Sequence, residues 1–153
     1  MARQRFLKAR IMTDCMPSAR KRIAHCCCGA LRAETIDEPI VVAACSCQEC
    51  QRRTGSAFGI GTFWSPDKVK IEGNATRFVR TADSGGRVVS YFCPQCGSTV
   101  YWEIPDLRPG WLAIAGGAFG HPDFPPPTMS IWERFKHEWV SIPVSQHLNG
   151  QPD

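Results

Sequence analysis

Residues 92–103 read Phe92-Cys93-Pro94-Gln95-Cys96-Gly97-Ser98-Thr99-Val100-Tyr101-Trp102-Glu103. Two cysteines separated by two residues form a zinc knuckle, a turn that points both sulfur atoms at one metal ion. The glycine that follows lets backbone N–H groups approach the thiolates. Thr99–Glu103 is rich in β-branched and aromatic residues, which is typical of a strand. The segment therefore predicts a metal-binding turn that leads into a β-sheet.

Similar short segments, bounded by Gly, Pro, Asp and Asn, recur on both sides of this one. The expected strands are Ala30–Thr35, Ile40–Ala44, Ile60–Trp64, Val69–Glu72, Arg77–Thr81, Val88–Phe92, Thr99–Glu103 and Trp111–Ala115, with tight turns at Glu72-Gly73-Asn74 and Ser84-Gly85-Gly86. One short helix is expected at Cys47–Arg53, although a zinc-bound loop would have the same pattern. The proline-rich residues His121–Pro127 exclude regular structure, and the residues expected to pack this segment onto the sheet are Ile131-Trp132 and Trp139-Val140. The predicted fold is mainly β, a single domain of antiparallel sheets.

The length and composition fit one folded domain and exclude two classes of protein. The chain has 153 residues, of which 43% are hydrophobic and 21% charged, which is unlike a disordered chain. No apolar run approaches the roughly 18 to 20 residues that span a bilayer, so no membrane association is expected. Lysine and arginine interrupt the N-terminus too often for a secretory signal, and we expect a cytoplasmic protein.

The positive charge is concentrated at the N-terminus. Residues 1–22 contain seven basic residues and one acidic residue, a net charge of +6, while the remainder carries −2. Nucleic-acid-binding domains usually carry their positive charge on the folded surface, so nucleic-acid binding is not expected. We expect a basic, flexible arm at 1–22, a zinc-binding domain at 23–145 and a flexible tail at 146–153. An edge strand of the sheet could pair two copies into a homodimer.

Nine cysteines, an odd number, favour metal binding over disulfide bonds in a reducing compartment. Eight of them form three clusters, Cys26-Cys27-Cys28, Cys45-Ser46-Cys47-Gln48-Glu49-Cys50 and Cys93-Pro94-Gln95-Cys96. The knuckle needs two further sulfurs, and the first cluster suits because alternate residues of an extended segment face the same way. Three thiolates then remain for a second zinc with an open fourth position, the arrangement of a catalytic zinc site. If His25 or Cys27 closed this site, both metals would be structural.

Three motifs occur in order, Cys26-x-Cys28-Gly29-Ala30, Cys45-Ser46-Cys47-x-x-Cys50-x-Arg52-Arg53-x-Gly55-Ser56-Ala57-Phe58 and Phe92-Cys93-x-x-Cys96-Gly97. In this order and spacing they resemble the glutathione-dependent formaldehyde-activating enzyme family, which also includes centromere protein V. The resemblance covers about residues 24–140 and implies a β-tent fold. It implies a structural zinc on Cys26, Cys28, Cys93 and Cys96, and a zinc at the active site on Cys45, Cys47 and Cys50. Two positions depart from the family pattern, because Cys27 is an additional cysteine and Ser130 stands where family members often have histidine.

The activity that the resemblance implies is that of a carbon–sulfur lyase, which joins glutathione and formaldehyde into S-hydroxymethylglutathione. Zinc suits this chemistry because it lowers the pKa of a bound thiol or polarises an aldehyde oxygen. Arg52 and Arg53 could pair with the carboxylates of glutathione and Ser56 could add a hydroxyl contact, whereas the alternative is a pair of solvated surface arginines. Two other functions stay open. The site could serve another thiol or aldehyde, or both zinc ions could stabilise a protein- or nucleic-acid-binding module without catalysis.

Overall fold

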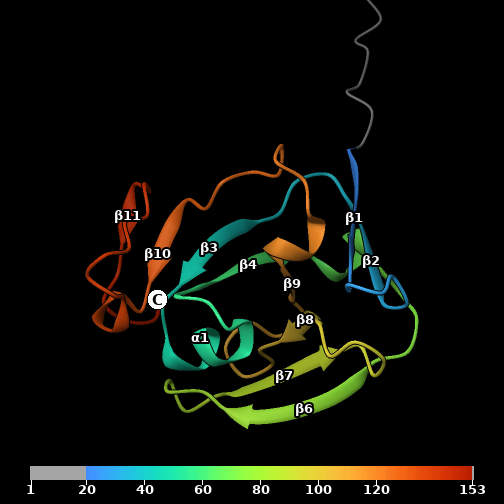
Figure 1. Ribbon diagram of the computed structural model, residues 1–153, viewed down its shortest axis with the longest axis horizontal. Helices are drawn as coiled ribbons and strands as arrows, with labels where there is room; N and C mark the ends of the chain where they lie inside the picture. The colour runs from blue at the N-terminus through green and yellow to red at the C-terminus, as the bar shows by residue number, and fades with distance from the viewer. Residues whose placement is uncertain (1–19, 153) are drawn as a thin grey trace, which may run out of the picture.

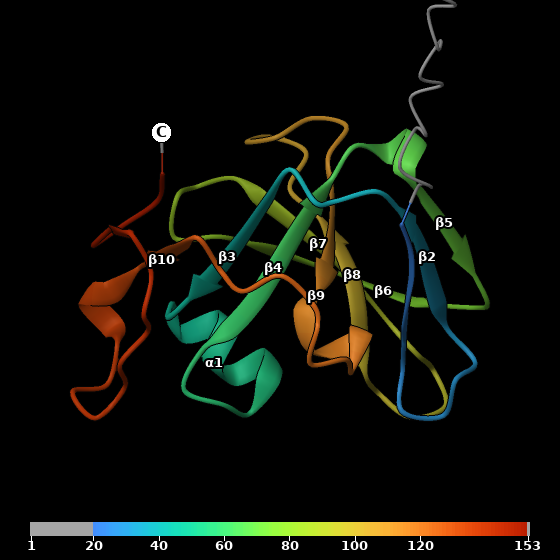
Figure 2. The same ribbon diagram turned by 90° about the horizontal axis from the view of Figure 1, so that it is seen from above.

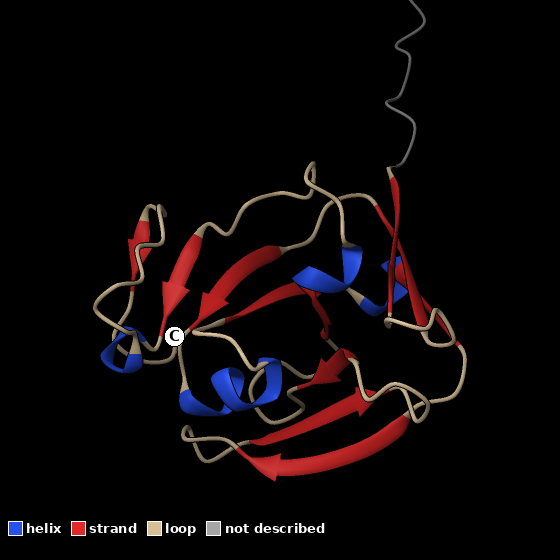
Figure 3. Ribbon diagram, in the orientation of Figure 1, coloured by secondary structure: helices blue, strands red, loops and turns tan. Residues whose placement is uncertain are grey.

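The computed structural model describes residues 20–152 of the chain, and β-strands dominate this part (Figure 1 and Figure 3). A three-stranded antiparallel sheet has the order β1-β2-β5, formed by Lys21–His25, Arg32–Ile36 and Val69–Glu72. A larger sheet has the order β11-β10-β3-β4-β9-β8-β7-β6. In chain order its strands are β3 (Val41–Cys45), β4 (Gly59–Trp64), β6 (Thr76–Thr81), β7 (Arg87–Phe92), β8 (Thr99–Glu103), β9 (Leu112–Ala115), β10 (Met129–Ile131) and β11 (Gln146–His147). The mainly β prediction is confirmed.

The larger sheet is curved around the single α-helix that the described residues contain. Figure 1 shows the sheet bending from β10 and β3 at the upper left, through β4 and β9, to β7 and β6 at the bottom, with α1 (Gln48–Thr54) inside the bend. Figure 2 shows β2 and β5 standing beside the larger sheet as a separate layer. Because successive side chains of a strand point to opposite faces, one set from each strand faces the inside of the bend. Residues far apart in the sequence therefore meet on this concave face.

Helix α1 confirms the predicted helix with a shift of one residue. Cys47 is its N-cap, and its sulfur accepts a hydrogen bond from the backbone N–H of Cys50 at 3.3 Å. Gly55 ends the helix in the left-handed conformation, and its N–H donates to the carbonyl oxygen of Gln51 at 2.8 Å. Three short 3-10 helices complete the regular structure of the described residues, at Pro66–Lys68, Gly116–Phe119 and Glu133–Phe135. No helix within residues 20–152 has the length and apolar character needed to cross a membrane.

All eight predicted strands are present, with ends that differ by at most two residues. The predicted turn at Ser84–Gly86 joins β6 to β7, closed by the N–H of Ala82 donating to the carbonyl of Gly86 at 2.7 Å. The turn at Glu72–Asn74 instead connects β5 of the smaller sheet to β6 of the larger one. The sheets are also not wholly antiparallel, because β10 pairs in parallel with both β3 and β11.

Strand β1 begins at Lys21, within the segment expected to be a flexible arm. Its basic residues are neutralised across the hairpin, since Lys21 lies 3.1 Å from the carboxylate of Glu34 and Arg22 lies 2.7 Å from that of Glu38. Ala24 of the same strand is fully buried. The positive charge of residues 1–22 led to an expected start of the domain at residue 23, whereas β1 begins at Lys21. Residues 1–19, the remainder of the expected arm, lie outside the described residues.

The C-terminal residues 146–152 pack on the domain, although the sequence predicts a flexible tail there. Strand β11 pairs with β10, and the N–H of Leu148 donates to the carbonyl of Ser130 at 2.8 Å. The reason is that β10 offers an open hydrogen-bonding edge, which no sequence pattern near residue 146 reveals. Ile131, Trp132 and Val140 are buried as predicted, but Trp139 is 76% exposed and does not pack on the sheet.

The main core cluster is centred on Leu31, Trp64, Val100 and Ile114, each at most 1% exposed. The buried polar atoms around Trp64 are paired. Its indole N–H donates to the hydroxyl of Thr62 at 2.8 Å, and that hydroxyl donates to the carbonyl of Ile114 at 3.0 Å. Such pairing allows a tryptophan to be buried completely without the cost of an unsatisfied N–H group.

Replacing Gly73 by alanine is expected to lower the free energy of unfolding by about 3 kcal/mol or more. Gly73 has φ +95°, and a Cβ atom there would lie 1.9 Å from the carbonyl oxygen of Ala30, in the loop that carries the first cysteine pair. Gly85→Ala is the matched control, because Gly85 has φ +86° with no atom within 4 Å of an added Cβ. Urea unfolding in zinc-containing buffer measures both, and equal losses in the two variants would contradict the clash.

Candidate metal centres and active site

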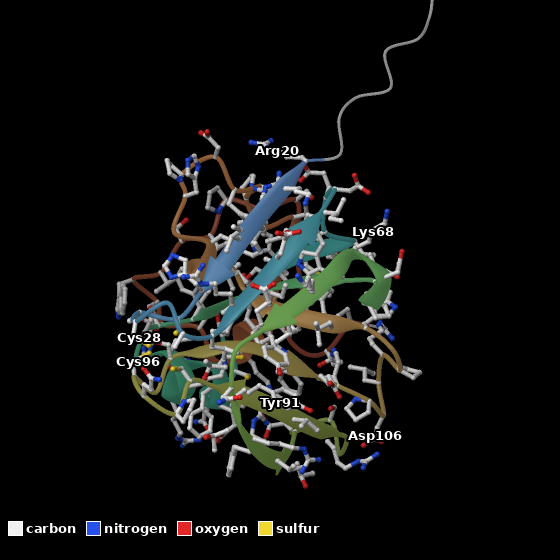
Figure 4. All side chains as sticks on the ribbon, turned by 90° about the vertical axis from the view of Figure 1, so that its right-hand side faces the viewer. Arg20, Cys28, Lys68, Tyr91, Cys96 and Asp106 are labelled. Atoms are coloured by element: carbon white, nitrogen blue, oxygen red, sulfur yellow. The ribbon has the colours of Figure 1, made fainter. Side chains whose placement is uncertain are left out.

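Four cysteines from two turns meet at one end of the β1–β2 hairpin. Cys26 follows β1 and Cys93 follows β7, so the two turns belong to different sheets. Each turn contains a glycine, Gly29 or Gly97, with φ +77° and +73° respectively. This is the left-handed backbone conformation, which residues with a side chain rarely adopt. Figure 4 shows Cys28 and Cys96 side by side at the surface, and their partners Cys26 and Cys93 are buried. The pairing expected from the sequence is present.

The geometry of this cluster fits a tetrahedral zinc ion. The sulfur of Cys28 lies 3.5 Å from that of Cys26 and 3.6 Å from that of Cys93, and all four sulfurs lie within 4.8 Å of one another. Zinc–sulfur bonds of about 2.3 Å in a tetrahedron place the sulfurs about 3.8 Å apart. The backbone N–H of Leu31 also donates to the sulfur of Cys26 at 3.2 Å, as expected for a thiolate.

The electrostatics of these four thiols favour a bound cation. Hydrogen bonds from the hydroxyl and backbone N–H of Ser98 lower the pKa of Cys96 to about 5. The backbone N–H of Ala30 favours the thiolate of Cys28, but the neighbouring sulfur of Cys26 opposes it and the pKa of Cys28 rises to about 12. Several thiolates this close repel one another, so all four can ionise together only around a cation.

The second cluster, which we call the cysteine triad, consists of Cys45, Cys47 and Cys50. Cys45 ends β3, Cys47 caps α1 and Cys50 lies in the first turn of the helix. Their sulfurs lie within 4.8 Å of one another. Among residues 20–152, no fourth cysteine, histidine or carboxylate ligand atom joins them within this distance. His25 and Cys27 therefore do not supply a fourth ligand to the triad. The fourth coordination position of a metal ion held by these three cysteines would not be filled by any of those ligand atoms.

The triad is held by contacts that do not depend on metal. The N–H of Ser46 donates to the carbonyl of Ile131 at 3.0 Å, which fixes the loop against β10. The side-chain amide of Gln51 donates to the carbonyls of Ser46 at 2.8 Å and Phe135 at 3.0 Å. Its amide oxygen lies 3.0 Å from Nε2 of His137. These bonds join α1 to the segment after β10 and preorganise the three thiols.

The thiols of the triad share their protons unequally. Hydrogen bonds from the thiols of Cys45 and Cys47, and then the positive charge of Arg53, lower the pKa of Cys50 to about 3. Hydrogen bonds with Cys47 and then with Cys50 raise the pKa of Cys45, which is also desolvated. One thiolate is thus stabilised without metal, and ionising the other two requires a cation. Three soft sulfur donors are the ligand set that zinc prefers.

A cavity of about 110 Å³ opens beside the triad on the concave face of the larger sheet. Its lining includes the three cysteines together with Arg53, Trp102 and Trp132. The guanidinium of Arg53 stacks on the ring of Trp102, 4.4 Å from its centroid. Gly59 makes room for this arrangement, since an added Cβ would lie 2.9 Å from Nη2 of Arg53. One cation is therefore fixed next to the triad.

The other residues expected at the site lie elsewhere. Arg52 points outward from α1 and pairs with Glu49, and Ser56 is exposed beyond the end of the helix. Neither lines the cavity. Ser130 is fully buried on β10 and is likewise not a lining residue, whereas its neighbour Ile131 is. Cys27 is exposed and lies outside both clusters.

Several lining residues were not anticipated from the sequence. Trp102 and Arg80 come from β8 and β6, and Gln151 comes from the C-terminal segment. The amide oxygen of Gln151 accepts a hydrogen bond from the indole N–H of Trp132 at 3.3 Å, so the C-terminal segment also contacts the cavity wall. The sequence shows which alternate residues of each strand share a face. It does not show which strands are neighbours, and this order is needed to predict which side chains line a common cavity.

A comparison with protein families agrees with the cysteine motifs. The profile of the glutathione-dependent formaldehyde-activating enzyme family matches residues 21–134. No curated protein matches the chain. Among solved structures, a crystal structure of a Rhodobacter sphaeroides protein is similar with a TM-score of 0.48 and 18% identity, covering 63% of this chain and 85% of that one. Since the family profile spans most of the sequence and includes all seven cysteines of the two clusters, the chain belongs to the glutathione-dependent formaldehyde-activating enzyme family.

Proposed function

We propose that the protein is a zinc-dependent carbon–sulfur lyase that forms or breaks the adduct of a thiol with an aldehyde, as in S-hydroxymethylglutathione. One observation carries the proposal: three thiols that fit zinc line a cavity, and no fourth cysteine, histidine or carboxylate ligand from the described residues joins the group. In this proposal Cys45, Cys47 and Cys50 hold an active-site zinc, while Cys26, Cys28, Cys93 and Cys96 hold a structural one. A cytoplasmic location is part of the same proposal.

The reaction needs no further reagent. The sulfur of the thiol bonds to the aldehyde carbon, the C=O double bond becomes a single bond, and the proton of the thiol ends on the oxygen. A zinc ion bound at such a site supplies thiol activation or polarisation of the aldehyde oxygen. The chain itself contributes a preorganised triad, a concave wall beside it, and the fixed charge of Arg53.

The test is the rate at which glutathione and ¹³C-formaldehyde exchange with S-hydroxymethylglutathione, followed by NMR exchange spectroscopy with and without the zinc-loaded protein. We expect an exchange rate that increases in proportion to protein concentration above the uncatalysed rate. A rate equal to that with the same concentration of free zinc would argue against catalysis by this site.

Arg53→Ala is expected to lower kcat/KM by about 10- to 100-fold, because the stacked guanidinium is the cation beside Cys50. Arg52→Ala is the matched control, since Arg52 adjoins Arg53 in the sequence but lies outside the cavity. Its kcat/KM is expected to stay within about twofold of the wild-type value. Zinc content is measured in both variants. Equal losses of activity in the two would show that net charge, and not the position of Arg53, matters.

A further inference from the structure

A second cavity, of about 240 Å³, continues the one at the triad along the concave face. Six residues line both cavities, namely Ala43, Phe63, Ile104, Leu107, Ile131 and Gln151. The two cavities are therefore parts of one depression. We call the part farther from the cysteines the apolar trough, defined by Val41, Ala43, Phe63, Leu107, Trp111 and Met129.

The pairing of the strands explains the direction of the trough. Cys45 lies opposite Gly59, Ala43 opposite Gly61, and Val41 opposite Phe63, so the same face of β3 and β4 leads away from the triad. On the other side, Ile131 lies beside Cys45 and Met129 beside Ala43. From Cys45 to Val41 the strand rises about 13 Å. The side chains in the middle of this face are small, because Ala43 and Gly61 lie there.

The two ends of the depression differ in chemistry. Within residues 20–152, the cavity at the triad has five charged residues in its lining, Glu49, Arg53, Arg80, Asp83 and Arg87. Among the described residues that line the trough, Arg108 is the sole charged one, and its guanidinium lies over the ring of Trp111 at 5.9 Å. The remaining trough side chains are largely aliphatic or aromatic. A concave, mostly apolar wall with a few polar groups at one end is typical of a small-molecule site.

We propose that the substrate of this site is an aldehyde with an apolar chain, whose carbonyl carbon reacts beside the triad and whose chain lies in the apolar trough. The inference rests on the proposed function and narrows its substrate. Formaldehyde has no chain to fill the trough, and a bare thiol adduct of formaldehyde would leave these apolar side chains in contact with water. The chemistry is unchanged: the thiol sulfur bonds to the aldehyde carbon and the thiol proton moves to the oxygen.

Turnover of two aldehydes of similar carbonyl reactivity tests the proposal. Each buried methylene group strengthens binding about fourfold, so the three extra methylenes of hexanal over propanal are expected to raise kcat/KM by about 60-fold. Leu107→Asp puts a charge into the trough at a partly exposed loop position and is expected to reduce this ratio below about threefold. Ile23→Asp, at a 51% exposed position of β1, is the control that keeps the full ratio.

A binding experiment separates this inference from the proposed function. Hexan-1-ol and propan-1-ol, which do not react, are titrated into the zinc-loaded protein while the indole N–H signals are followed by NMR. Hexan-1-ol is expected to shift the signal of Trp111, which lines the trough, and to bind about 60-fold more tightly than propan-1-ol. The signals of Trp64, buried in the core, and Trp139, exposed elsewhere, serve as internal references.

The outcomes are distinct. A shift of Trp111 by hexan-1-ol without turnover of any aldehyde would support the trough and refute the proposed function. Turnover of formaldehyde together with equal kcat/KM for propanal and hexanal, and no shift of Trp111, would overturn the inference and leave the proposed function standing.

Discussion

Cys47→Ser is expected to lower the zinc content from two ions to one per chain and to reduce turnover of glutathione with formaldehyde by at least about 100-fold. Removal of a ligand should cost at least as much as removal of a group that only orients a ligand, for which losses of about 10- to 100-fold are typical. The domain is expected to stay folded, because the loop of the triad is held by Gln51 and by the bond from Ser46 to Ile131.

The matched control is Cys27→Ser, which changes an exposed cysteine outside both clusters. It is expected to keep two zinc ions and full turnover. Elemental analysis gives the zinc content, circular dichroism reports the fold, and the exchange assay gives turnover. A Cys47→Ser protein that loses zinc but keeps its turnover would contradict an active-site role for the triad.

Cys93→Ser is expected to abolish the cooperative folding of the domain. Cys93 is fully buried, and its partner Cys26 follows a strand of the other sheet, so a metal ion held between them would join the two sheets. Structural zinc contributes about 10 to 16 kcal/mol in small zinc domains. That is comparable to the whole stability of a typical domain, about 5 to 15 kcal/mol.

Thermal unfolding followed by circular dichroism measures this effect, with Cys27→Ser again as the control in the same motif region. We expect no cooperative transition for Cys93→Ser and a normal one for the control. A folded Cys93→Ser protein with wild-type unfolding temperature would show that the four-cysteine cluster is dispensable for the fold.

The positions of most strands could be predicted from the sequence, but the way in which the strands pair could not. Thr99–Glu103 and Val69–Glu72 coincide with β8 and β5, because β-branched and aromatic residues bounded by turn residues mark a strand locally. Strands β1, β10 and β11 were missed. Lys21 and Arg22 are basic residues that become paired only across a hairpin, and the edge of β10 that binds β11 is created by the fold.

The candidate site also has a part that could be predicted from the sequence and a part that could not. Both cysteine groups could be predicted, since the spacing within each motif is local and chelating residues must lie close together. The cavity could not, because Trp102, Arg80 and Gln151 come from distant segments that only the strand order brings together. Arg52 and Arg53 are adjacent in sequence, yet only Arg53 lines the cavity, as α1 turns neighbouring residues to different sides.

The decisive measurement is the turnover of protein stripped to one zinc per chain as a second equivalent of zinc is added back. We expect turnover to be negligible with one zinc ion and to rise in proportion to the second equivalent until two ions are bound, because the triad offers one ligand fewer than the four-cysteine cluster and is expected to fill last. Turnover that stays at the uncatalysed rate when both sites are full would contradict an active-site zinc and would instead favour a zinc-stabilised binding module.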